Sequence, residues 1–460
     1  MGSGLNRRQF LSSTAMAAVG AGLLGAGGTA AARPSAPASR KGARAKNLIF
    51  MSADGLSFGA LTLGELVSRR TRGRGLHWLE WIGSGIARRS LIATDAADRL
   101  IPDSASSASA WGIGERVNND VLCVTPDGRR PTPLFVRLKQ AGMTTGVVTT
   151  TAVVDASPAA LLVNAESRSD LRGIAAMYLE RDIDLVVGGG RQFFSAEMVA
   201  QYPDVRVTAS LAEMTAGAGQ PGRVFALLGD GDLPAAIDRR GAEPAFVDLV
   251  RASLAQVQDA PDGFALFLES EETDNTAHDN DGAGLAHAVM AFDDGVGAAL
   301  EFCRGRDDTL LIVTTDHANA SPAFARYGKN EAEQFERLCA AQESFRSIFR
   351  RLRAMTGPKG GAELAALLRE GQGVELDERD IDILDRWLMK EQVEPLDLRN
   401  KIYSPMGSVV GNHLGVAFNS HTHTADHVEA TAMGPGAEML PPVGHLVDIH
   451  RMIVGAMGVG

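Results

Sequence analysis

Four short apolar segments, each ending in or followed by an acidic residue, constrain the fold of this 460-residue chain more than any other feature. They read NLIFMSADG at 47–55, TTGVVTTTAVVDAS at 144–157, GFALFLES at 263–270 and TLLIVTTDHA at 309–318. Such runs are typical of buried parallel strands, which need helices on both faces. The carboxyl ends of parallel strands share one edge, where ligands bind. We therefore predict an α/β fold whose central, mostly parallel sheet is sandwiched by helices, with a site at that edge.

The acids that end these segments are Asp54, Asp155, Glu269 and Asp316. Each acid alone is typical of a helix cap or a loop. Together at one sheet edge they would repel one another by several kcal/mol, which predicts a bound cation.

The types of side chain near these acids suit two kinds of metal ion. Asp274 and His278 are four residues apart, so a helix would put both on one face, where they suit Zn²⁺. The adjacent pair Asp316 and His317 can serve a second metal. Oxygen ligands alone suit a harder ion such as Mg²⁺, and three of them are Asp155, Ser157 and Glu269.

Four of the ten histidines lie between residues 413 and 427, in GNHLGVAFNSHTHTADH. Asp274 and His278 alone leave a zinc ion short of the usual three protein ligands, so we expect one histidine of this cluster to complete the site. Spacing does not decide which one. The isolated histidines are read as surface or hydrogen-bonded core residues; they are His77, His287, His445 and His450.

The segment IPDSASSASAW at 101–111 is unusually rich in serine. A flexible linker is one interpretation, but the intervening residues are alanines, which favour a helix. Asp103 or Ser104 would then cap that helix. A serine at a helix start lies where backbone N–H groups attract anions, so Ser104 could attack a phosphorus or acyl centre.

The N-terminus predicts export. Residues 1–32 contain Arg7 and Arg8, then an apolar Ala/Gly-rich run, a layout that resembles a twin-arginine signal; a membrane anchor is the alternative. Residues 33–46 read as a basic linker, and we expect a periplasmic or extracellular protein with no membrane span in the mature chain. The net charge of −11 argues against nucleic-acid binding, and the three cysteines form no CxxC pattern.

From about residue 47 to 460, the chain resembles the alkaline phosphatase family of metal-dependent phosphomonoesterases. The motifs occur in the order typical of that family: Asp54-Gly55, Asp103-Ser104-Ala105, Asp155-Ala156-Ser157-Pro158, Ser167-Arg168, Glu269 to His278, Asp316-His317 and His423-Thr424. The whole ordered set is far more specific than any one motif.

The resemblance implies a site residue by residue. Ser104 would be the nucleophile that carries a phosphoserine intermediate, and Arg168 would bind the phosphate of a monoester substrate; a surface salt bridge is the alternative for Arg168. The first zinc would be bound by Asp274, His278 and His423, and the second by Asp54, Asp316 and His317 beside Ser104. Asp155, Ser157 and Glu269 would hold magnesium, with Asp54 bridging to it. Inorganic phosphate would be the product. The sequence is compatible with a homodimer but does not decide the oligomeric state.

Two further segments need an interpretation. A helical insertion is predicted at about 322–410, serving as packing, association or a lid, and its arginines read as a solvated face. The glycines of DLVVGGGRQFF at 184–194 predict a tight turn after a strand rather than a nucleotide loop. The alternatives to a monoesterase are a phosphodiesterase or sulfatase of the same superfamily, a non-catalytic metal- or phosphate-binding protein, and a nicotinamide oxidoreductase.

Overall fold

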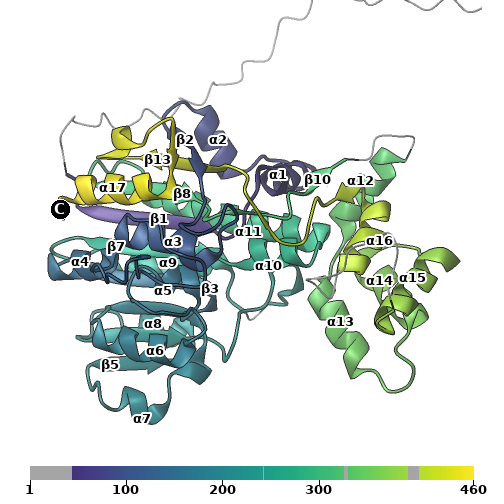
Figure 1. Ribbon diagram of the computed structural model, residues 1–460, viewed down its shortest axis with the longest axis horizontal. Helices are drawn as coiled ribbons and strands as arrows, with labels where there is room; N and C mark the ends of the chain where they lie inside the picture. The colour runs from purple at the N-terminus through teal and green to yellow at the C-terminus, as the bar shows by residue number, and fades with distance from the viewer. Residues whose placement is uncertain (1–43, 242, 326–329, 392–403) are drawn as a thin grey trace, which may run out of the picture. The chain divides into compact units, whose positions relative to one another are not determined.

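The computed structural model describes residues 44–241, 243–325, 330–391 and 404–460, which belong to one compact unit (Figure 1). Within these residues one large sheet has the strand order β14-β2-β13-β8-β1-β7-β3-β4-β6-β5. The strands are β14 Val443–His445, β2 Arg88–Ala93, β13 Val428–Met433, β8 Thr309–Thr314, β1 Asn47–Ala53, β7 Phe264–Ser270, β3 Thr144–Ala152, β4 Leu185–Gly189, β6 Arg223–Leu227 and β5 Val205–Thr208.

The pairing confirms the predicted fold class. All neighbouring strands from β8 to β5 run parallel. Only β13 runs against its neighbours, β8 and β2. The four segments singled out in the sequence form β8, β1, β7 and β3, which lie side by side in the middle of the sheet.

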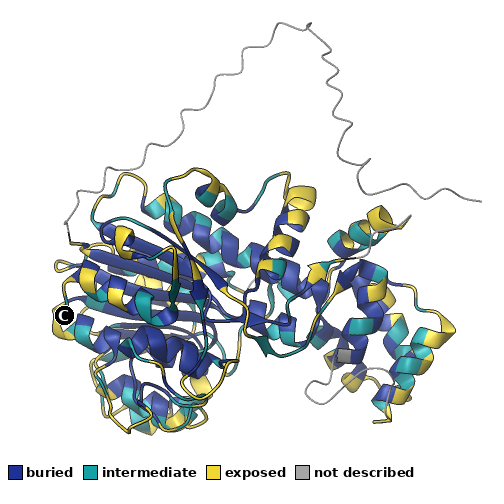
Figure 2. Ribbon diagram, turned by 45° about the horizontal axis from the view of Figure 1, so that its top comes forward, coloured by how far each residue is buried: buried dark blue, intermediate teal, exposed yellow. Residues whose placement is uncertain are grey.

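The sheet has a hydrophobic core on each face because its central strands are buried on both sides (Figure 2). In β1, Ile49 and Met51 pack into one core, and Leu48 and Phe50 pack into the other. The first core is covered by α1 Phe58–Arg72, α2 His77–Gly83, α8 Leu211–Ala216, α9 Phe246–Val257 and α11 Gly282–Phe302. The second is covered by α3 Ser104–Ile113, α4 Leu134–Gln140, α5 Ala156–Ala159, α6 Leu171–Glu180, α7 Ala196–Val199 and α17 Leu446–Met457.

The predicted insertion is helical in its described residues. Its helices are α12 Glu331–Ala340, α13 Phe345–Ala354, α14 Gly361–Gln372, α15 Glu378–Leu388 and α16 Ser404–Leu414. They pack onto α1 and α11 and extend the first core (Figure 1). Two short ribbons border the insertion and the site: β10 Ala323–Phe324 pairs with β11 Val416–Ala417, and β9 Ala318–Asn319 pairs with β12 His423–Thr424.

Several smaller expectations have a plain outcome. Of the three glycines, Gly188 and Gly189 end β4, and Gly190, at φ 87°, leads directly into the short 3₁₀ helix Arg191–Phe193. Cys123, Cys303 and Cys339 are free thiols. In the part of the chain that the structure describes, no helix has the length and apolarity to cross a membrane. The predicted export signal at 1–32 and most of the linker at 33–46 lie outside the described residues.

Candidate metal centre

The acids at the strand ends meet at one edge of the sheet. Asp54 follows β1 directly, Asp316 comes two residues after β8, and Asp155 comes three residues after β3. Glu269 lies within β7, where it pairs with Ser52 of β1. Because β8, β1, β7 and β3 are parallel neighbours, their carboxyl ends bring these acids together, as the sequence pattern predicted.

Ser104 begins α3, and the serine-rich segment is a buried helix rather than a linker. Asp103 is the N-cap residue, whose side chain accepts a hydrogen bond from the Ser106 backbone at 2.9 Å. In turn, the Asp103 backbone N–H donates to the Ser106 hydroxyl oxygen at 3.3 Å, which completes a capping box. This cap fixes Ser104 so that its Oγ lies 3.3 Å from His317 Nε2.

Asp274 and two histidines form the first cluster. His278 Nε2 lies 3.1 Å from Asp274 Oδ2 and 3.1 Å from His423 Nε2, and His423 Nε2 lies 3.5 Å from Asp274 Oδ1. Both Nδ1 atoms face backbone carbonyls at 2.8 Å, those of His421 and Pro102. A carbonyl only accepts, so each Nδ1 carries the proton and each Nε2 presents a lone pair. Lone pairs and carboxylate oxygens facing one another are a donor set for a cation.

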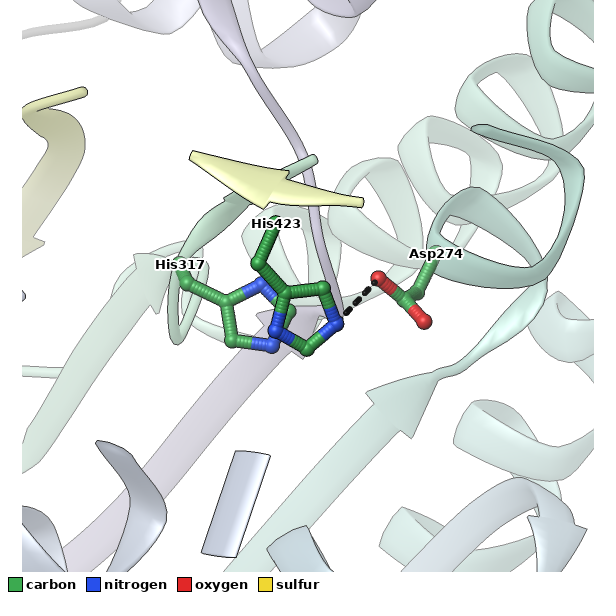
Figure 3. A group of neighbouring side chains, drawn as sticks. All are labelled: Asp274, His317 and His423. Carbon is green, nitrogen blue, oxygen red and sulfur yellow. Dashed lines mark ion pairs between the residues drawn. The ribbon is translucent and has the colours of Figure 1, made fainter. Parts of the chain in front are cut away.

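His317 joins this cluster to a second one. Its ring stacks on His423 with centroids 3.7 Å apart, and ligand atoms of Asp274, His317 and His423 lie within 4.8 Å of one another (Figure 3). Figure 3 also shows the ion pair between Asp274 and His423. On its other side, His317 Nε2 lies 3.1 Å from Asp316 Oδ2 and 3.6 Å from Asp54 Oδ1. Two candidate metal groups thus lie next to each other and next to Ser104.

A third group of carboxylates comprises Asp54, Glu269 and Glu271, whose oxygens lie within 4.8 Å of one another. Ser157 Oγ donates to Asp54 Oδ2 at 3.2 Å, and Thr149 Oγ1 donates to Glu269 Oε2 at 2.7 Å. The other oxygens, Asp54 Oδ1 and Glu269 Oε1, are buried and accept no hydrogen bond from any described residue. Buried oxygens without a donor are rare in folded proteins, so this group of oxygens is suited to a cation.

Arg168 lies between two carboxylates at the rim of this site. Its guanidinium contacts Asp155 Oδ1 at 2.8 Å and Asp103 Oδ2 at 3.4 Å. Among the described residues Arg168 forms no surface salt bridge with its neighbours Glu166 or Asp170, and Glu166 pairs with Arg130. The contact with Asp155 also means that this acid, predicted as a magnesium ligand, is engaged by a cation of the protein itself.

The electrostatics of the cluster favour bound metal. Burial, with repulsion from Asp316, raises the pKa of Asp54 well above its usual range. Burial also raises the pKa of Glu269 to about 8, of Asp316 to about 7, and of Glu271 well above its usual range. Burial lowers the pKa of His317 well below its usual range, so that its ring is neutral and can bind a metal.

Two residues at this site were not predicted from the sequence. Glu271 stands among four acids in six residues, and no signal separated it from a surface acid at a helix start. Arg346, read as part of a solvated face of the insertion, instead donates to Asp279 Oδ2 at 2.5 Å and to Asn275 Oδ1 at 2.9 Å. A charged residue at the start of the amphipathic segment 345–354 was the only available hint.

Comparisons with known proteins agree with this fold. The family model described as alkaline phosphatase matches residues 45–214 and 201–458. The chain is 24% identical over 363 residues to alkaline phosphatase 4 of Bacillus subtilis, covering 75% of this chain and 74% of that protein. It is 29% identical over 340 residues to streptomycin-6-phosphate phosphatase of Streptomyces griseus, covering 61% and 75%. The solved alkaline phosphatase of Thermus thermophilus has a TM-score of 0.84 and 25% identity, covering 95% of this chain and 96% of that one.

Proposed function

We propose, from the premise that the chain belongs to the alkaline phosphatase family, that it hydrolyses phosphate monoesters through a phosphoserine intermediate on Ser104. The family consists of metal-dependent hydrolases. The proposal is supported most by one observation: the Nε2 atoms of His278 and His423 lie 3.1 Å apart and face the carboxylate of Asp274, and the Ser104 hydroxyl lies beside them, 3.3 Å from His317 Nε2.

The two proposed zinc sets follow the clusters of the structure. One zinc ion would be held by Asp274, His278 and His423, and a second by Asp54, Asp316 and His317, with the Ser104 hydroxyl beside it. The family resemblance would assign magnesium to Asp155, Ser157 and Glu269, with Asp54 as a shared ligand, whereas in the structure Asp155 pairs with Arg168. When bound, these ions lower the pKa of the serine hydroxyl and stabilise negative charge on the attacking and leaving oxygens.

The residues of the chain supply the rest of the chemistry. The Ser104 oxygen, held at the start of α3, forms a bond to phosphorus as the bond from phosphorus to the ester oxygen breaks. A water molecule then takes the phosphoryl group, which restores the Ser104 hydroxyl and releases inorganic phosphate. The planar guanidinium of Arg168 matches two phosphate oxygens, and its contacts with Asp103 and Asp155 hold it at the rim of the site.

The nucleophile is tested by Ser104→Ala. We expect turnover of a chromogenic monoester to fall by about a thousandfold or more, with zinc and magnesium still bound. Ser107→Ala is the matched control, because Ser107 lies on the same helix and its buried hydroxyl has no hydrogen-bond partner in the described residues. A Ser104→Ala protein that keeps activity within about tenfold of the wild type would rule out this nucleophile.

The phosphate clamp is tested by Arg168→Ala. Inhibition by inorganic phosphate should weaken at least about tenfold, because a bidentate contact is lost, while the zinc content stays the same. Arg129→Ala, which removes an exposed guanidinium paired with Glu115, serves as the control. Phosphate inhibition that does not change would argue against the clamp.

Export is part of the same proposal and rests on the sequence of residues 1–32. Changing Arg7 and Arg8 together to lysine should keep the protein in the cytoplasm. Cell fractionation with activity staining would measure this, and unchanged export of the double variant would contradict a twin-arginine signal.

A further inference from the structure

Glu271 lies in the third carboxylate group although the family resemblance gives it no role. It is the N-cap residue of α10 Glu272–His278, two positions after Glu269. Its backbone N–H donates to Thr150 Oγ1 at 3.0 Å, which ties this turn to β3. The tie holds the Glu271 carboxylate within 4.8 Å of oxygens from Asp54 and Glu269.

The partners of this group leave a definite place for a cation. Asp54 is 1% exposed and Glu269 is fully buried, and one oxygen of each accepts no hydrogen bond from the described residues. The donors nearby, Ser157 and Thr149, are directed at the other oxygen of each acid. The guanidinium of Arg168 is held by Asp103 and Asp155. Three mutually repelling carboxylates thus lie together, and Glu269 Oε1 among them is buried with no donor in the described residues.

We propose that Glu271 is a direct ligand of the third cation, together with Asp54 and Glu269, and that the group selects a hard ion such as Mg²⁺. Three carboxylates offer oxygen ligands only. Mg²⁺ prefers oxygen ligands, whereas zinc usually binds nitrogen and sulfur. Asp155 then acts on Arg168 as its ion-pair partner. The inference rests on the proposed function, because the third cation belongs to that active site.

Glu271 also lines a cavity of about 400 Å³, which Asn275 and Arg346 border, so a contact with substrate is the competing role. The two roles differ in what they affect. A metal ligand changes magnesium binding in the absence of any substrate, whereas a substrate contact changes KM and leaves magnesium binding as it is.

The test is a calorimetric titration of zinc-loaded full-length protein with Mg²⁺. Glu271→Gln should weaken Mg²⁺ binding at least about tenfold, because it removes a charged ligand but keeps the shape of the side chain. Glu243→Gln is the matched control: it makes the same change at an exposed acid on the same cavity, and it should bind Mg²⁺ like the wild type. Asp155→Asn shows whether Asp155 contributes to the site.

Magnesium affinity that Glu271→Gln leaves unchanged, with or without a change in KM, would overturn the proposal. If the variant does not fold, anomalous diffraction from Mn²⁺ in wild-type crystals gives the answer. A third-site ion within about 2.5 Å of a Glu271 oxygen supports the proposal, and one with no Glu271 oxygen at that distance refutes it.

The same experiments separate this inference from the proposed function. Wild-type protein that binds Mg²⁺ through Glu271 but does not hydrolyse monoesters would refute the proposed function and support Glu271 as a ligand. Active wild-type protein whose Mg²⁺ affinity does not depend on Glu271 would support the function and refute the role of Glu271.

Discussion

Two groups of buried acids near helix α10 differ in the partners that the chain gives them. On the insertion side, Glu272 pairs with Arg239, Asp279 pairs with Arg346, and Asp281 accepts the backbone N–H groups of Gly284 and Phe345. On the sheet side, Asp54, Glu269 and Asp316 each keep a buried oxygen that accepts no hydrogen bond from the described residues.

This contrast shows what each group is for. An ionised carboxylate is costly to bury unless it is paired, and on the insertion side the chain supplies the partner itself. It does so with residues far away in sequence, such as Arg239 and Arg346. At the sheet edge, the described residues supply no such partner for one oxygen of Asp54, Glu269 and Asp316. A metal ion would neutralise these acids. Under the proposed function, the first group stabilises the fold and the second binds ions.

The largest expected effect comes from Asp316→Asn, which removes one acid of the sheet edge. Turnover should fall by about a thousandfold or more as the second metal is lost. The metal-free variant should be at least as stable to urea as the metal-free wild type, because a repelling buried charge has gone. Metal analysis and urea unfolding of chelated protein measure both. A metal-free variant that is clearly less stable would break the contrast.

The opposite result is expected for Arg239→Ala on the insertion side. Glu272 would then be buried without its cation, which should lower the free energy of unfolding by about 3 kcal/mol. Metal content at saturation should not change. Combining Arg239→Met with Glu272→Gln should restore part of the stability. If Arg239→Ala lost bound zinc without losing stability, Arg239 and Glu272 would support metal binding rather than the fold, which would contradict the comparison.

The pH dependence of the metal-free protein gives a third test. The pKa of Glu269 is raised from 4.5 to about 8 in the folded state, and that of Asp316 from 3.8 to about 7. The buried histidines, such as His317, have lowered pKa values and oppose this effect below about pH 7. Between about pH 7 and 8 these acids hold more protons in the folded chain than in the unfolded chain, so stability falls as pH rises. We expect a loss on the order of 1 kcal/mol between pH 7 and 8, measured by urea unfolding.

Bound metal should reverse this trend, because metals bind the deprotonated ligands. The stabilisation that zinc and magnesium add should therefore grow from pH 5 to 8. Metal-free stability that rises between pH 7 and 8 would contradict the raised pKa values.

The smallest effect is expected for Arg346→Ala, which cuts the contact between the insertion and α10. The side chain of Arg346 is 39% exposed, so solvent screens its pair with Asp279, and the loss should be about 1 kcal/mol. Arg350→Ala, four residues along α13, is the control. An unchanged midpoint of thermal unfolding in Arg346→Ala would show that this contact does not support α10.

Much of the fold and part of the site could be predicted from the sequence. Buried parallel strands leave a strong local pattern, so Asp54, Glu269 and Asp316 could be assigned to strand ends, and the parallel order of β8, β1, β7 and β3 then brings them together. The helix at Ser104 followed from alanine content and the capping residue Asp103.

The contacts that depend on tertiary structure could not be predicted. Arg346 meets Asp279 across 67 residues, and helical periodicity shows only that Arg346 avoids the apolar face of α13. Glu271 differs from Glu272 only in what lies opposite each carboxylate: Arg239 for Glu272, and the oxygens of Asp54 and Glu269 for Glu271. Neighbours in the chain do not carry that information.

The central claim is that the buried acids and imidazoles of the sheet edge bind the metals that the hydrolysis of a phosphate monoester needs. The most direct test is the metal content of the purified protein, measured with its hydrolysis of a monoester and a diester before and after chelation. We predict about two zinc ions and one magnesium ion per chain, and monoester activity that exceeds diester activity, is lost on chelation and returns with the metals. Monoester hydrolysis that survives complete removal of metal would contradict the account.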